Sequence, residues 1–182
     1  TEGYNCPVIE LMTEIRAAHQ LIIDDIEAID ISMNWLETSY PSPAFPNLTR
    51  SVPGVGSTHY FAAYTCVNGS YPALRDRIDA GAPVPSDEPL VMDLLKKVEV
   101  TGHKDRPAFA PKITICMKGG TIYEGEYKGD ELEWDLAMET RRISGLFDDI
   151  PFDSHKLNAL VETITRLEME GSIESVIGLC IR

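Results

Sequence analysis

The sequence contains few cysteines and no long apolar run. Its four cysteines are scattered and show no Cys-x-x-Cys spacing, which argues against a disulfide framework or a zinc site and favours reduced thiols in a cytoplasmic protein. No apolar stretch approaches the roughly 20 residues of a membrane span, and no signal peptide is visible. We therefore expect neither a metal site nor a membrane partner.

Basic residues are scarce as well. The 182 residues include 16 Lys and Arg against 29 Asp and Glu, which gives a formal net charge of −13. Such a charge argues against nucleic acid or anionic membranes as partners, and an anionic substrate would need a local basic pocket. The length suits one domain, or one domain with an appendage.

Apolar and polar residues alternate between positions 29 and 35, which predicts a strand with one buried face. The apolar members are Ile29, Ile31, Met33 and Trp35, and the polar members are Asp30, Ser32 and Asn34. If the Trp35 ring is buried with the others, Trp35→Ala should cost about 3 kcal/mol or more.

Two further strands and a series of helices follow. Residues 112–118 and 121–127 flank Gly119-Gly120 and predict a hairpin, whereas the pattern is helical from Gly129 onward. We predict an α+β fold: a small antiparallel sheet with helices on one face in residues 1–128, and a helical C-terminal arm in residues 129–182.

A loop rich in Gly and Pro leads into a helix at about residue 57. Ser57 or Thr58 can cap this helix, and Gly69 can end it. Because free amides and the helix dipole converge at a helix start, this point can bind an anion. Arg50, Ser57, His59 and Tyr60 lie around it in the sequence. The alternative is a purely structural turn with a partly buried His and Tyr.

Six stretches, taken in order, resemble the second domain of the MmgE/PrpD family, which includes 2-methylcitrate dehydratase and cis-aconitate decarboxylase. The stretches are Glu2-Gly-Tyr-Asn-Cys6, Asp24-Asp-Ile-Glu-Ala-Ile-Asp-Ile31, Gly56-Ser-Thr-His-Tyr60, Val98-Glu-Val-Thr-Gly-His103, Pro111-Lys-Ile-Thr-Ile-Cys-Met-Lys-Gly-Gly120 and Gly129-Asp-Glu-Leu132. The resemblance covers most of the chain.

The resemblance implies a lid-like first segment and a C-terminal segment that packs on a larger, all-helical domain. That helical domain is absent from this sequence, so we expect it on a separate chain, in a hetero-oligomer. Two positions depart from the family pattern: Glu2 stands where a Lys is common, and Gly56 where a Phe is common.

The resulting hypothesis is the small or C-terminal subunit of a heteromeric, cofactor-independent lyase. Its substrate would be a small hydroxy or unsaturated carboxylic acid. His59 and Tyr60 are the candidate catalytic residues, since His59 can exchange protons and Tyr60 can donate one. Arg50, Ser57 and Glu2 are the candidate substrate-binding residues. The alternative is a non-catalytic lid or assembly subunit, which the acidic Glu2 favours.

Overall fold

The computed structural model describes residues 3–39, 57–72, 89–144 and 153–180. Contacts divide the chain into two compact units: unit 1 comprises Thr1–Pro72 and Gly81–Leu132, and unit 2 comprises Ala73–Ala80 and Glu133–Arg182. Among the described residues, no helix is both long enough and apolar enough to cross a membrane.

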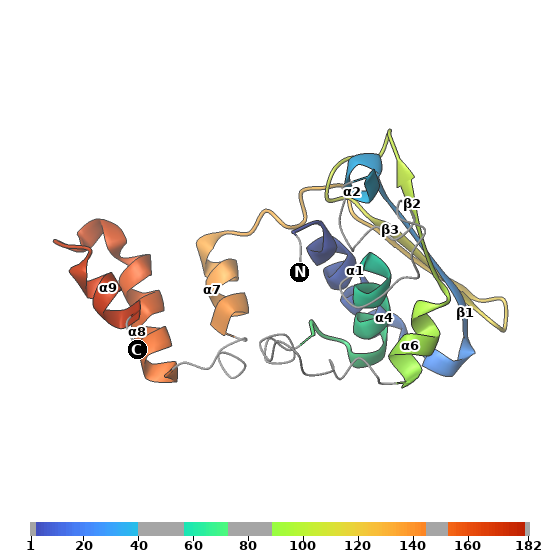
Figure 1. Cartoon of the computed structure of the whole chain (residues 1–182), viewed down its shortest axis with the longest axis horizontal. Helices are drawn as coiled ribbons and strands as arrows, with labels where there is room; N and C mark the ends of the chain where they lie inside the picture. Colours follow the sequence, from blue (N-terminus) through green and yellow to red (C-terminus); the bar gives the residue numbers. More distant parts are fainter. Residues whose placement is uncertain (1–2, 40–56, 73–88, 145–152, 181–182) are drawn as a thin grey trace. The chain divides into compact units, whose positions relative to one another are not determined.

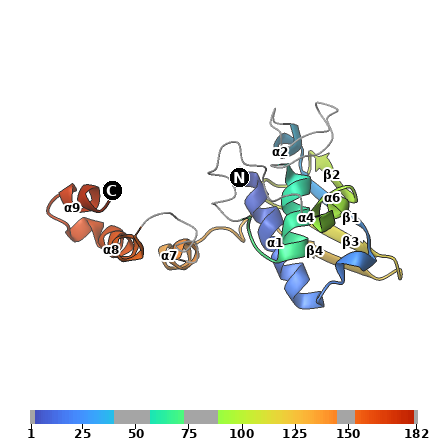
Figure 2. The same cartoon turned by 60° about the horizontal axis from the view of Figure 1, so that its bottom comes forward.

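Unit 1 is a four-stranded sheet with helices on one face (Figures 1 and 2), as predicted. Its strands are β1 (Ile26–Asn34), β2 (Val98–His103), β3 (Lys112–Met117) and β4 (Ile122–Glu126). Its helices are α1 (Cys6–His19), α2 (Trp35–Ser39), α4 (Thr58–Asn68) and α6 (Pro89–Leu95). Short 3-10 turns, Gly3–Asn5 and Ile23–Asp25, precede α1 and β1.

The sheet is mixed, which corrects the prediction of a purely antiparallel one. The strand order is β2-β1-β3-β4; β1 pairs with β3 and β3 with β4 in antiparallel fashion, but β1 and β2 run parallel. The short turn 118–121 permits a hairpin between β3 and β4. A long connection that includes α4 and α6 separates β1 from β2, and such a crossover returns the chain in the same direction.

The predicted alternation holds along β1 and fails at its end. Ile29, Ile31 and Met33 are fully buried, and Asp30 lies on the opposite, wet face. Trp35 is not part of the strand: it begins α2 and remains 41% exposed, with the Lys104 ammonium 5.6 Å from its ring centroid. The expected burial of Trp35 is therefore wrong, because the alternation continues past the residue where pairing stops.

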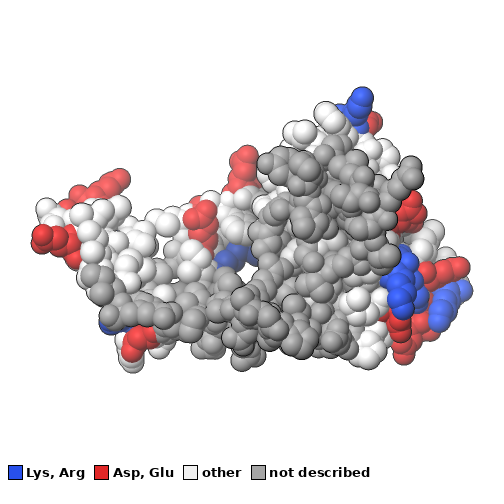
Figure 3. Space-filling view, viewed as in Figure 1, with Lys and Arg blue, Asp and Glu red and all other residues white. Residues whose placement is uncertain are grey.

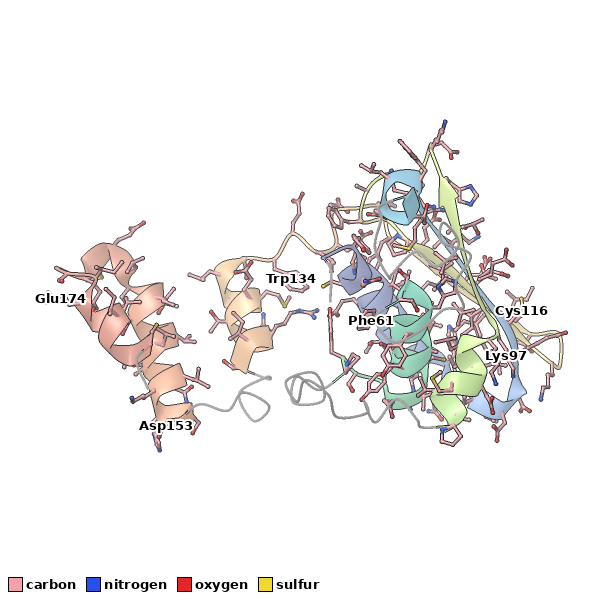
Figure 4. All side chains as sticks on the ribbon, in the orientation of Figure 1. Phe61, Lys97, Cys116, Trp134, Asp153 and Glu174 are labelled. Carbon is pink, nitrogen blue, oxygen red and sulfur yellow. The ribbon has the colours of Figure 1, made fainter. Side chains whose placement is uncertain are left out.

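The helices α1, α4 and α6 bury their apolar sides against the inner sheet face. The contact between α1 and β4 is close at Gly125, where an added methyl group would lie 2.8 Å from Cδ1 of Leu11. From α4, Phe61 is buried in the same core (Figure 4). One core thus joins the N-terminal helix, the sheet and α4.

Within the part that the structure describes, unit 2 consists of helices and their connections and has no strand. It contains α7 (Leu136–Ser144), α8 (Ser154–Thr165), the 3-10 turn Leu167–Met169 and α9 (Glu174–Cys180). Asp153 caps α8, since its Oδ1 accepts from the backbone amides of His155 and Lys156 at 2.8 and 3.1 Å. Helices α8 and α9 pack on each other.

Candidate functional site

The helix starts of α1 and α4 lie next to each other in unit 1. The hydroxyl of Thr58, the first residue of α4, donates to Oδ1 of Asn5, the residue before α1, at 2.8 Å. Ser57 caps α4: its Oγ accepts from the backbone amide of Tyr60 at 3.0 Å, as the sequence predicted for Ser57 or Thr58. All four of these residues are buried.

The two helices run side by side in the same direction. Their far ends also meet, because a methyl group on Gly69, just after α4, would overlap Nη1 of Arg16 near the end of α1. Gly69 has a φ of 74° and ends α4 as predicted, with its amide bonded to the carbonyl of Thr65. The positive ends of both helix dipoles therefore converge where Asn5 and Thr58 meet.

His59 is buried in the first turn of α4. Its side chain is 3% exposed, and its Nδ1 has no hydrogen-bond partner among the described residues. Burial lowers the pKa of His59 from 6.5 to about 4, because the apolar surroundings disfavour the imidazolium. The ring is therefore neutral at pH 7 and can donate a hydrogen bond or accept a proton.

Tyr60 is part of the core. It is 2% exposed and makes ring contacts with Phe61 and Tyr64, at centroid distances of 5.8 and 5.9 Å. Tyr60 is a candidate catalytic residue from the sequence, and the structure places its side chain in the core, where it is as buried as His59. His59 and Tyr60 are both in the first turn of α4, and this turn of the helix is buried like its middle.

The other predicted site residues are only partly covered by the structure. Ser57 lies at the start of α4, but its hydroxyl oxygen already accepts the hydrogen bond from the backbone amide of Tyr60 that caps the helix. Glu2 and Arg50 lie outside the described residues. The structure therefore brings together Ser57, His59 and Tyr60, and it adds Asn5, which the sequence analysis did not single out.

The sequence next to Asn5 contains a pattern that indicates a helix start. Asn5 immediately precedes Cys6-Pro7, and Pro in the first turn of a helix often follows a polar residue at the N-cap. Its carboxamide does not cap α1, however, because Oδ1 is turned toward Thr58. The sequence could indicate a helix start here, but not a contact with a residue 53 positions away.

A second group of polar residues surrounds the loop between β2 and β3. The carboxylate of Glu37, in α2, accepts from the backbone amides of Phe109 and Asn34 at 2.7 and 3.2 Å, while burial raises its pKa. Phe109 has a left-handed backbone with a φ of 57°. Glu37 thus fixes this loop to the end of β1, which is a structural role.

A polar hollow of about 250 Å³ lies beside the same loop, on the outer side of the sheet. It is lined by Ser32, His103, Asp105, Arg106, Pro107 and Glu126. The Arg106 guanidinium is already engaged, because Nη1 donates to the carbonyl of Ala110 and Nη2 to Glu126. The charges of Arg106 and Glu126 thus compensate each other, while Asp105 adds a further negative charge to the lining.

Charged residues elsewhere are mixed in sign. On the face shown in Figure 3, basic side chains stand beside acidic ones on the sheet unit. The Lys112–Glu124 and Arg106–Glu126 pairs, at 3.1 and 2.9 Å, are examples. Within the described residues, no group of three or more His, Cys, Asp or Glu side chains is placed to hold a metal ion.

No protein-family model matches this chain, and no curated protein is similar enough to it to count as a relative.

Proposed function

We propose that this chain is the small or C-terminal subunit of a heteromeric, cofactor-independent lyase of MmgE/PrpD type in the cytoplasm. The reaction would be a dehydration, hydration or decarboxylation of a small hydroxy or unsaturated carboxylic acid. The observation that carries the proposal is the exposed apolar surface of unit 2, which suits a second helical chain.

Every described residue of unit 2 is at least partly exposed. Its exposed large apolar side chains are Leu136, Met138, Ile143, Ile164, Leu167, Met169, Ile173 and Ile177. Two short helices such as α8 and α9 cannot bury two apolar faces against each other alone. Exposed apolar surface of this kind marks a protein interface, and the family resemblance suggests a helical first-domain chain as the partner.

The proposed chemistry is an acid–base elimination at the start of α4. A base removes a proton from carbon, a double bond forms, and the hydroxyl leaves as water after protonation. His59 would be the base, since it is neutral at pH 7. Tyr60 would donate a hydrogen bond, and Ser57, Arg50 and Glu2 would complete the substrate site together with the partner chain.

Partner binding gives the first test. Because the exposed apolar side chains of unit 2 are in contact with water, we expect the isolated chain to self-associate or to bind a hydrophobic dye. In a stoichiometric complex with a helical partner chain, it should do neither. Sedimentation and native mass spectrometry measure this. The double variant Ile173→Asp, Ile177→Asp should abolish the complex, whereas Ile122→Asp, on the edge strand β4 of unit 1, should not. If the isolated chain is a monomer that binds no hydrophobic dye, the proposal of a partner chain is refuted.

Turnover by the assembled complex gives the second test. Loss of a general acid or base costs about 100-fold to 10,000-fold in rate. His59→Gln should therefore reduce turnover at least about 100-fold while the complex still assembles. His19→Gln is the matched control, because His19 is exposed and stacks on Tyr123. Full activity of His59→Gln would remove the catalytic assignment.

One observation favours the alternative of a non-catalytic lid or assembly subunit. Burial holds the pKa of His59 near 4, which makes it a weak base, and Tyr60 is enclosed in the core. If His59→Gln and Tyr60→Phe both leave turnover unchanged in an active complex, this alternative is the correct function.

A further inference from the structure

The polar hollow of unit 1 lies where the connection from β2 to β3 passes the end of β1. Strand β1 lies between β2 and β3, so the chain has to cross β1 before it can enter β3. In this connection, the backbone carbonyl of Arg106 accepts a hydrogen bond from Nδ2 of Asn34, the last residue of β1, at 2.5 Å. This bond holds the connection to the sheet, and the connection supplies Asp105, Arg106 and Pro107 to the lining of the hollow.

The strands supply the rest of the lining. Ser32 of β1 is paired with Lys112 of β3, and Lys112 is paired with Glu126 of β4, so these three residues lie side by side across the sheet. The Lys112 ammonium is bonded to Glu124 at 3.1 Å. From the strands, the described lining of the hollow consists of Ser32, His103 and Glu126.

The charges of the lining do not cancel. Arg106 contributes one positive charge, whereas Asp105 and Glu126 contribute two negative ones. Nη2 of Arg106 donates to Oε1 of Glu126 at 2.9 Å, so these two charges compensate each other. Within the part of the chain that the structure describes, the Asp105 carboxylate has no hydrogen-bond or ion-pair partner, and neither has the Ser32 hydroxyl. The hollow therefore offers one uncompensated carboxylate and one free hydroxyl group.

We propose that this hollow binds a small organic cation that carries a protonated amino group. The ammonium group of the ligand donates to the Asp105 carboxylate, and the Ser32 hydroxyl forms a second hydrogen bond with the ligand. A hydrogen bond between ionised groups is about twice as strong as one between neutral groups, so the ammonium supplies most of the affinity. An anion is disfavoured, because the net charge of the lining is negative.

The size of the hollow limits the ligand. Its volume of about 250 Å³ is smaller than the roughly 300–1,000 Å³ of pockets for drug-sized molecules, so the ligand has only a few heavy atoms. All six lining residues belong to unit 1, and none of them is assigned to the lyase site. The inference therefore goes beyond the proposed lyase function.

The test is a titration of the ¹⁵N-labelled full chain at about pH 7.5, followed by the chemical shifts of the backbone amides. The probes are ethanolammonium chloride, ethylene glycol and tetramethylammonium chloride, at an ionic strength held constant with sodium chloride. Ethanolammonium should cause saturable shifts at Ser32, Asp105 and Arg106. Ethylene glycol has a similar size without the charge, and tetramethylammonium has the charge without N–H donors. Both should bind at least about tenfold more weakly, because neither forms a charge-assisted hydrogen bond.

Two variants test the residues. Asp105→Asn should weaken ethanolammonium binding at least about tenfold, because it removes the uncompensated charge. Ser32→Ala should weaken binding about two- to tenfold, the usual effect of one neutral hydrogen bond. Asp24→Asn is the matched control: it removes the same charge from an exposed residue outside the hollow and should bind like the wild type. Because Asp105 is exposed, urea unfolding of Asp105→Asn should match the wild type, which separates binding from folding.

Three results would overturn the proposal. Ethanolammonium causes no saturable shift at the hollow, one of the other two probes binds as tightly, or Asp24→Asn weakens binding as much as Asp105→Asn. In the last case, the net charge of −13 attracts the cation and the hollow does not select it. The titration needs neither a partner chain nor turnover. A chain that binds ethanolammonium at the hollow but forms no complex and has no lyase activity would therefore disprove the proposed function and leave this inference intact.

Discussion

The free energy of unfolding of the wild-type chain should fall by up to about 3 kcal/mol, relative to His59→Gln, as the pH drops from 6.5 to about 4. The unfolded chain binds a proton at His59 near pH 6.5, whereas burial keeps the folded chain from binding it until about pH 4. The stabilisation from a neutral, buried His59 is therefore complete above pH 6.5 and is lost as the pH falls through this window.

The comparison with His59→Gln is necessary because Glu37 acts in the opposite sense. Burial raises the pKa of Glu37, so its contribution to stability is complete below the ordinary pKa and is lost as the pH rises through the raised value. Urea unfolding at several pH values measures the difference. The variant His103→Gln, which changes an exposed side chain, should keep the wild-type pH dependence. If His59→Gln shows the same slope as the wild type, burial of a neutral His59 is disproved.

Ile31→Ala should cost about 2–5 kcal/mol of unfolding free energy, the usual cost of a large cavity in a packed core. Ile31 is fully buried in β1, between Val100 of β2 and Ile113 of β3, both of which are buried too. With strands on both sides and helices above, the site has little freedom to collapse around the missing atoms. Urea unfolding monitored by circular dichroism measures the change.

Trp35→Ala is the informative contrast. The alternation in the sequence assigns Trp35 to the same buried face as Ile31, but the ring is 41% exposed at the start of α2. We now expect a cost below about 1 kcal/mol, which is typical of a surface substitution away from the core. Equal costs for Trp35→Ala and Ile31→Ala would show that Trp35 belongs to the core after all.

Local chemistry explains which features the sequence predicted. A period of two along β1, the Gly-Gly turn before β4, and the Ser57 and Gly69 caps of α4 all depend on neighbouring residues, and the structure contains all of them. The same patterns cannot show where a strand stops. Pairing with β2 and β3 decides that, so Trp35 was assigned to the wrong element.

The sequence by itself determined the α+β class, the strand pattern of β1 and the helix start at Ser57, because periodicity and caps act over a few residues. Only the tertiary structure decided that β1 and β2 are parallel, that Tyr60 lies in the core, and that Asn5 meets Thr58. These features depend on contacts between residues far apart in the chain. Such contacts depend on how whole helices and strands pack, for which the local pattern carries no signal.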